Sequence, residues 1–146
     1  MHIEVIARAF WTAQGRVLLC RNVEHGYYYL PGGHVEPGEP ARVALAREFV
    51  EETGHSPTVG ECCLVSEVLF EARRKRHHEI NLIFRITDPP PPNLASREPE
   101  LAFEWAEQAS IVDLDLRPQG VKAWLASDTR SEGPHPLWLE QPDDAV

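Results

Sequence analysis

The chain has 146 residues, of which 42% are hydrophobic and 25% are charged. This composition is typical of one globular domain and argues against a disordered chain. The 23 acidic and 14 basic side chains give a formal net charge of -9, so the surface would repel a phosphate backbone and no nucleic-acid duplex is expected as a partner. No apolar run approaches the roughly 18 residues of a membrane span, and the N-terminal residues lack the pattern of a signal peptide. We therefore expect a cytoplasmic protein with no membrane partner.

Two apolar-rich runs open the chain. They cover residues 3–11 and 16–21 and surround Ala13-Gln14-Gly15, which predicts a β-hairpin. Apolar residues fall on both faces of the first run, so we expect a central strand covered on both sides. Residues 31–40 are rich in Gly and Pro and predict a loop.

Further strands are expected in the second half of the chain. Residues 61–71 and 79–86 predict two strands around the basic turn Arg73-Arg74-Lys75-Arg76, and residues 100–105 predict a short third strand. The cluster from Arg73 to His78 is the one basic concentration in an acidic chain, and either a substrate or partner role or simple solubility would account for it. The cysteines form an odd set that we expect to be reduced: Cys20, Cys62 and Cys63.

The C-terminal part predicts a second helix and a tail. The helix begins at Pro118 and should bury Val121, Trp124 and Leu125. We therefore expect a domain over residues 1–127 and a polar, Pro-rich tail over residues 128–146. We expect this tail to be either disordered or a short arm that docks on a neighbour. Trp138 favours the arm, which is compatible with a homodimer.

The helix expected at about residues 40–53 carries two kinds of residue. Pro40 suits the start of a helix, and Gly54 suits the left-handed residue just past its end. On a helical wheel, an apolar arc contains Val43, Leu45, Ala46, Phe49 and Val50, and a separate acidic arc contains Glu48, Glu51 and Glu52. These carboxylates repel one another, and a hard cation such as Mg²⁺ with phosphate ligands would relieve the repulsion. A solvated acidic helix face is the alternative.

The loop before this helix favours the metal hypothesis. Gly32-Gly33 lets the backbone approach a ligand closely and provides a carbonyl as a further oxygen ligand. Glu39 is expected at the helix start, where the helix dipole favours an acid. Arg47 lies at the edge of the acidic arc, where its guanidinium can hold carboxylates in place by charge-assisted hydrogen bonds.

The spacing Gly33-x5-Glu39-x7-Arg47-Glu48-Phe49-x-Glu51-Glu52-x-Gly54 resembles the signature of the Nudix hydrolase family. One position departs from that signature, because His55 stands where an aliphatic residue normally follows the last glycine. The resemblance implies an α/β fold of the Nudix type, an α/β/α sandwich with a mixed β-sheet between helices. It also implies hydrolysis of a phosphoanhydride bond in a nucleoside diphosphate derivative such as ADP-ribose, a nucleotide sugar or a nucleoside triphosphate.

The resemblance also implies roles for particular residues. Glu48, Glu51, Glu52 and the carbonyl of Gly32 match the positions that hold Mg²⁺ in the family, with Mn²⁺ as an alternative, and Arg47 completes the catalytic set. The general base varies among family members. Glu48 is our expectation from within the motif, and the candidates outside it are Glu79, Glu98, Glu100 and Glu104.

The residues that would bind the substrate are less strongly indicated. Tyr27 and Tyr29 could stack on a base or pack at the rim of the core. Arg8 and Arg21 could bind phosphate or form surface ion pairs. Glu79 could face the cleft or the solvent.

Two other functions are compatible with such a chain. A non-catalytic nucleotide-binding sensor of the same fold is the main alternative, although degenerate family members tend to lose the glutamates that this chain keeps. A diphosphate isomerase of related fold would need catalytic groups that the sequence does not identify.

Overall fold

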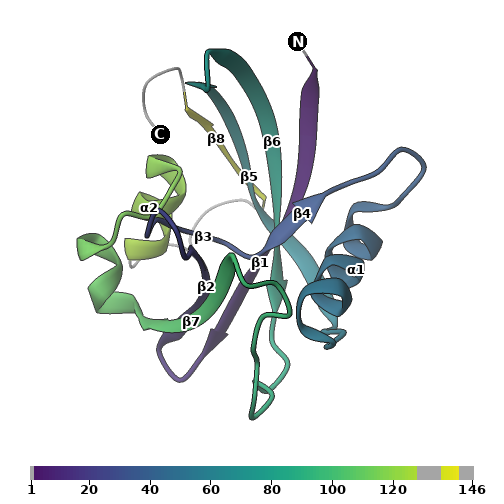
Figure 1. Cartoon of the computed structure of the whole chain (residues 1–146), viewed down its shortest axis with the longest axis vertical. Helices are drawn as coiled ribbons and strands as arrows, with labels where there is room; N and C mark the ends of the chain where they lie inside the picture. The colour runs from purple at the N-terminus through teal and green to yellow at the C-terminus, as the bar shows by residue number, and fades with distance from the viewer. Residues whose placement is uncertain (1, 128–135, 142–146) are drawn as a thin grey trace.

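The computed structural model of the protein describes residues 2–127 and 136–141. The strands are β1 (Ile3–Ala13), β2 (Arg16–Asn22), β3 (Tyr28–Tyr29), β4 (Gly32–His34), β5 (Val59–Ala72), β6 (Lys75–Ile86), β7 (Leu101–Glu107) and β8 (Leu137–Gln141). The helices are α1 (Ala41–Thr53), α2 (Gln119–Ala126) and the short 3-10 helix η1 (Gln108–Asp113). Figure 1 shows α1 and α2 on opposite sides of the strands, which confirms the predicted sandwich.

The sheet is mixed, as predicted. Its strand order is β3-β2-β1-β6-β5-β8, with β4 also paired to β1 and β7 to β2. The β1–β6 and β5–β8 pairs are parallel, and the other pairs are antiparallel. The hairpin at the start of the chain is confirmed, since Ala13 pairs with Arg16. β1 is the predicted central strand and is buried on both faces.

Each face of the sheet carries its own apolar core. Ala7, Ala9 and Trp11 of β1 pack with Leu45 and Phe49 of α1 on one side. The other core surrounds α2, and its buried residues include the three predicted for that helix: Val121, Trp124 and Leu125. The sequence periodicity therefore places α2 correctly on the sheet.

The face that α1 buries differs from the predicted apolar arc. Val43 and Val50 are 54% and 43% exposed, whereas Glu52 is only 8% exposed. The buried residues of the helix are Ala44, Leu45, Phe49, Glu52 and Thr53. The helix is thus turned so that part of its acidic arc faces the protein, which hydrophobicity alone could not predict.

The ends of α1 follow from its flanking residues. Helical geometry begins at Ala41, one residue later than predicted, because Pro40 adopts an extended conformation with φ -61° and ψ 143°. Gly54 ends the helix at φ 81°, and its amide donates to the carbonyl of Val50. Glycine adopts this left-handed conformation without the strain that a side chain would cause.

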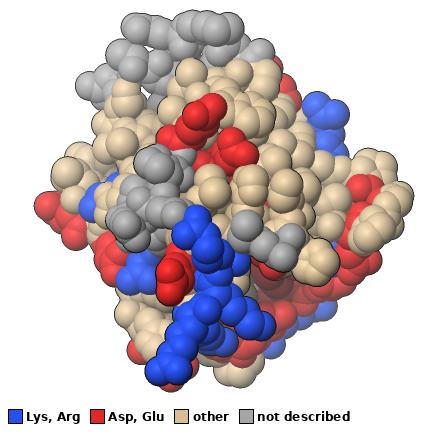
Figure 2. All heavy atoms as spheres, turned by 90° about the horizontal axis from the view of Figure 1, so that it is seen from above, with Lys and Arg blue, Asp and Glu red and all other residues tan. Residues whose placement is uncertain are grey.

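The basic residues of the second hairpin lie at its tip. The two-residue turn between β5 and β6 is Arg73-Arg74, with φ of 53° and 63°, and Lys75 and Arg76 already belong to β6. All four side chains are exposed. Figure 2 views the molecule from above, the end at which the tip lies in Figure 1, and shows basic side chains gathered there.

Part of the predicted tail belongs to the sheet. β8 pairs in parallel with β5, so that Leu137 lies beside Leu64, and Trp138 is 52% exposed. The rest of the tail, residues 128–135 and 142–146, lies outside the described residues. The three cysteines are unpaired, as expected. In the part of the chain that the structure describes, no helix has the length and apolarity needed to cross a membrane.

The orientation of α1 can be tested with two substitutions on the same helix. Leu45→Ala is expected to lower the free energy of unfolding by about 2–5 kcal/mol, because Leu45 is fully buried. Val43→Ala should change it by less than about 0.5 kcal/mol, because that side chain is exposed. Chemical denaturation of both variants measures the difference. Equal destabilisation would contradict this orientation.

Candidate active site

Two glycines bring the loop before α1 against the sheet. Gly32–His34, part of the predicted loop, forms the short strand β4, in which Gly32 pairs with Arg8 of β1. A Cβ atom on Gly32 would overlap the backbone of Ala7 and Arg8, and one on Gly33 would overlap the carboxylate of Glu48. Glycine at these positions therefore allows the close approach that places Glu48 beside the loop.

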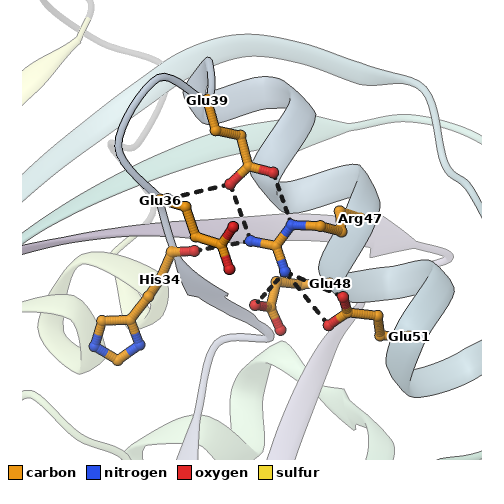
Figure 3. A network of polar contacts seen from close by, with 6 residues as sticks. All are labelled: His34, Glu36, Glu39, Arg47, Glu48 and Glu51. Atoms are coloured by element: carbon orange, nitrogen blue, oxygen red, sulfur yellow. Dashed lines mark hydrogen bonds and ion pairs between the residues drawn. The ribbon is translucent and has the colours of Figure 1, made fainter.

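Arg47 is the centre of a polar network (Figure 3). Its Nε and Nη2 donate to the two oxygens of Glu39 at 2.7 and 3.0 Å, and its Nη2 also donates to the carbonyl of His34 at 3.1 Å. Its Nη1 donates to Glu48 at 3.1 Å and to Glu51 at 3.3 Å. A planar guanidinium can make such a set of contacts, whereas a lysine ammonium cannot. These contacts are those expected of a residue that orients carboxylates.

Glu39 ties the loop to the helix through Arg47. It precedes Pro40, and the start of the helix has no side-chain capping hydrogen bond. The carboxylate of Glu39 binds the side chain of Arg47 instead of the helix terminus. The hydrogen bond from Arg47 holds the pKa of Glu39 below its usual value. Glu39 also accepts a hydrogen bond from the backbone amide of Glu36 at 3.1 Å, which closes the turn between β4 and α1.

Glu52 lies at the buried side of the acidic cluster. Burial is the largest cause that raises its pKa, to about 8, and the negative charges of Glu48 and Glu98 add to the effect. The positive charge of Arg8 acts in the opposite direction. Because Glu51 acts on Glu98 in the same way, Glu48, Glu51, Glu52 and Glu98 form one electrostatically coupled group.

Glu98 reaches this group from the loop between β6 and β7. The amide of Arg97 donates to the carbonyl of Glu52 at 2.7 Å, which fastens the loop to the end of α1. Ser96 accepts a hydrogen bond from the amide of Glu98 through its Oγ at 3.0 Å. Partial burial raises the pKa of Glu98, as do the charges of Glu100, Glu48 and Glu51.

The other base candidates outside the motif have different surroundings. Glu104 binds Arg21 at 3.3 Å on the β2–β7 pair, and it also accepts from Tyr28, which raises the pKa of that tyrosine. Glu100 acts on Glu98 electrostatically. Glu79 lies on β6 and lines a cleft together with Arg8.

The donor set suits a hard divalent cation. As the side chains stand, no three His, Cys, Asp or Glu groups among residues 2–127 and 136–141 converge closely enough to hold a metal ion, and Arg47 instead binds Glu48 and Glu51. All the clustered groups are nevertheless carboxylates, which Mg²⁺ and Mn²⁺ prefer. A bound cation would also relieve the repulsion that raises the pKa of Glu52.

A cleft of about 500 Å³ lies next to Arg8. Three further predicted binding residues, Tyr27, Tyr29 and Glu79, line it with Arg8. The guanidinium of Arg8 donates to Asn81 at 3.1 Å and to the carbonyl of Leu30 at 3.0 Å. Because Arg8 also interacts electrostatically with Glu52, it connects the cleft with the acidic cluster.

Arg21 is not among the residues that line this cleft. Its partner is Glu104, and its strand neighbours are Tyr28 and Ala102. Arg21 therefore forms an ion pair at the surface, which was the alternative to phosphate binding in the sequence analysis.

Two residues of the cleft and one of a small adjoining pocket were not identified as binding residues from the sequence. Arg117 lies over the ring of Tyr27 at 4.4 Å, Phe70 contributes an aromatic wall, and Asn81 lies beside Glu79. A polar amide within an apolar run was a usable sequence signal for Asn81, which the structure buries. Nothing in the local sequence distinguishes Arg117 or Phe70 from ordinary surface and core residues.

The thiol of Cys20 lies close to the site but is not an activated nucleophile. Burial raises its pKa to about 11, and a hydrogen bond from the hydroxyl of Tyr29 only partly offsets the effect. A reactive cysteine requires a lowered pKa. Cys20 therefore lacks this feature of a reactive thiol.

Known proteins resemble the chain in sequence and fold. A CTP pyrophosphohydrolase of Escherichia coli (strain K12) is 43% identical over 63 residues, which cover 40% of this chain and 46% of that protein. The chain thus matches less than half the length of this curated relative. The crystal structure of a MutT NUDIX hydrolase from Burkholderia pseudomallei has a TM-score of 0.61 and 26% identity, covering 74% of this chain and 85% of that one.

A MutT protein from Bacillus halodurans shares the fold with a TM-score of 0.69, at 22% identity over 85% of this chain and 80% of that one. A family model described as the NUDIX domain matches residues 2–125. Since this match includes the whole acidic cluster and most of the sheet, the chain belongs to the NUDIX domain family.

Proposed function

We propose that the protein is a Mg²⁺-dependent pyrophosphohydrolase that cleaves a phosphoanhydride bond in a nucleoside diphosphate derivative, with a nucleoside triphosphate as the first choice. The observation that carries the proposal is that Arg47 holds Glu48 and Glu51 while Glu48 lies against Gly33, and that Arg8, which pairs with Gly32, lines a cleft that could hold a nucleotide. The name of the Escherichia coli relative, a CTP pyrophosphohydrolase, supports the choice of a triphosphate. ADP-ribose and nucleotide sugars are the other substrates of this class.

Glu48, Glu51 and Glu52, with the carbonyl of Gly32, would hold Mg²⁺ or Mn²⁺. Nudix hydrolases generally use divalent metal ions. Such an ion supplies charge to neutralise the diphosphate oxygens and to make the attacking water more acidic. Arg47 positions the glutamates through its contacts with Glu39, Glu48 and Glu51.

The remaining residues bind the substrate and accept the proton. Arg8 lines the cleft and also acts electrostatically on Glu52, so its positive charge can attract the phosphates. Tyr27 and Tyr29 provide flat surfaces for the base. Glu98 is our choice of general base, because it joins the cluster from a separate loop and is not a proposed metal ligand. Glu48 is the alternative from within the motif.

The function is tested by incubating the protein with Mg²⁺ and separate nucleoside triphosphates, ADP-ribose, nucleotide sugars and dinucleoside polyphosphates. Phosphorus NMR of the products is the measurement. We expect a triphosphate such as CTP to give the monophosphate and pyrophosphate. Tight nucleotide binding with no hydrolysis of any compound would contradict the proposal and favour the sensor. A homodimer and a cytoplasmic location stay predictions from the sequence.

The metal site is tested with the double variant Glu51→Gln, Glu52→Gln. Divalent-ion affinity should fall about 100-fold or more, since even the loss of a group that only supports a ligand costs about 10- to 100-fold. Calorimetric titration of Mn²⁺ and the hydrolysis rate measure the effect. Glu61→Gln is the control, because Glu61 lies on β5 in an exposed ion pair with Arg85. Unchanged Mn²⁺ binding in a folded double variant would contradict the proposed ligands.

The general base is tested by comparing Glu98→Gln with Glu104→Gln. Loss of the base should lower kcat about 100- to 10,000-fold, whereas the Glu104 variant should stay within about threefold of the unmodified protein, because Glu104 binds Arg21 away from the cluster. Steady-state kinetics at saturating Mg²⁺ give both values. If Glu98→Gln kept nearly full activity, the base would have to be sought within the motif, with Glu48 first.

A further inference from the structure

Flat side chains line the cleft from two separate parts of the chain. The ring of Tyr27 packs against that of Tyr29 at 5.9 Å and lies under the guanidinium of Arg117. On the sheet, Phe70 stacks on His77 at 4.8 Å with nearly parallel rings. Aromatic walls of this kind accept the π-face of any nucleobase. They give affinity for a base but do not distinguish one base from another.

The polar groups of the cleft differ in how far they are already engaged. Arg8 donates to Asn81 and to the carbonyl of Leu30, and Arg117 donates to both oxygens of Asp115 at 3.2 and 3.1 Å. Both guanidinium groups are thus held by protein partners. Glu79 is engaged on one side only, by a long 3.4 Å hydrogen bond from Asn81 to its Oε1. Within residues 2–127 and 136–141, its Oε2 has no hydrogen-bond partner.

The side chain of Asn81 connects Arg8 with Glu79 and orients the carboxylate of Glu79. Asn81 is only 4% exposed, and its Oδ1 accepts the hydrogen bond from Arg8. Its amide nitrogen must therefore point toward Glu79. Glu79 is held in place by a donor behind it, and its carboxylate faces the cleft as a group that only accepts hydrogen bonds.

A carboxylate in this position distinguishes bases by the polarity of their edges. Cytosine presents an exocyclic amino group at the corner of the ring, and a carboxylate accepts well from such a group. Uracil presents a carbonyl oxygen at the same corner. Its one ring N–H lies between two carbonyl oxygens, which a carboxylate repels.

We propose that Glu79 is a specificity residue that accepts a hydrogen bond from the amino group of the base, so that the cleft selects cytosine nucleotides over uracil nucleotides. This inference rests on the proposed function, because it concerns which nucleotide occupies the cleft beside the acidic cluster. Glu79 is half-buried in the unliganded cleft, and a bound base would cover it further. Covering an acceptor without supplying a donor is costly, so a site of this kind discriminates against the analogue that lacks the donor.

The test measures binding of CMP and UMP by calorimetry in the absence of metal. The unmodified protein should bind CMP at least about tenfold more tightly than UMP, and Glu79→Gln should reduce this ratio to below about threefold, because an amide can present either a donor or an acceptor. Glu61→Gln, which changes an exposed glutamate on β5, should keep the original ratio. Thermal unfolding confirms that each variant is folded.

Three results would overturn the inference: equal affinity for the two nucleotides in the unmodified protein, no detectable binding of either, or an unchanged ratio in folded Glu79→Gln. Hydrolysis is scored separately with CTP and UTP in the presence of Mg²⁺. Selective CMP binding without hydrolysis of any nucleotide would overturn the proposed enzyme and support the role of Glu79. Hydrolysis of CTP and UTP with equal kcat/KM, together with equal binding of CMP and UMP, would support the proposed enzyme and overturn the role of Glu79.

Discussion

Repulsion among carboxylates is the constraint on which the site depends. Glu48 and Glu51 are held by Arg47, which is itself anchored by two hydrogen bonds to Glu39. Glu52 has no ion pair with Arg47 among the described contacts, and its pKa rises because burial and its acidic neighbours disfavour a further negative charge. The guanidinium of Arg47 thus balances part of the negative charge of the cluster. The remaining repulsion is what a bound divalent ion would relieve.

Strand β1 connects the parts of the site through its backbone pairing. This strand pairs with β4, which brings Gly33 against Glu48, and with β6, which carries Asn81 and Glu79. Arg8 on the same strand lies opposite Gly32. The central strand therefore sets the distance between the acidic cluster and the cleft. A change in its register would separate the two, since a shift by one residue moves every side chain to the other face.

The sequence predicts the chemistry of the site better than its orientation. The four-residue spacing of Arg47 and Glu51 was sufficient to predict their contact, because residues four apart share one face of a helix. The contacts of Arg47 with Glu39 and Glu48 do not follow from that spacing. The same wheel placed Val43 and Val50 in the core, yet both are exposed while Glu52 is buried. Hydrophobicity identifies the buried face only when burial is the sole demand on a helix, and α1 must also turn its carboxylates toward Gly33.

Long-range placement was the other part that the sequence could not supply. Glu98 and Glu104 are similar candidates in the sequence, but a backbone hydrogen bond from Arg97 to Glu52 fastens the first beside α1, whereas strand pairing carries the second to Arg21. Arg8 and Arg21 are also similar candidates in the sequence, but Arg8 lines the cleft whereas Arg21 pairs with Glu104. Such differences arise from contacts between residues far apart in the chain, which local patterns do not contain.

The two parts of the site are built from different elements. The acidic cluster belongs to α1 and the loop after β6, whereas the cleft is formed by residues of β5 and β6, the segment around β3, and the residues before α2. Arg8 belongs to the cleft and also acts on Glu52. Substitutions such as those at Glu79 or Phe70 can therefore alter the shape and polarity of the cleft without moving the carboxylates. This separation gives a physical reason why one fold can keep its reaction while its substrate preference changes.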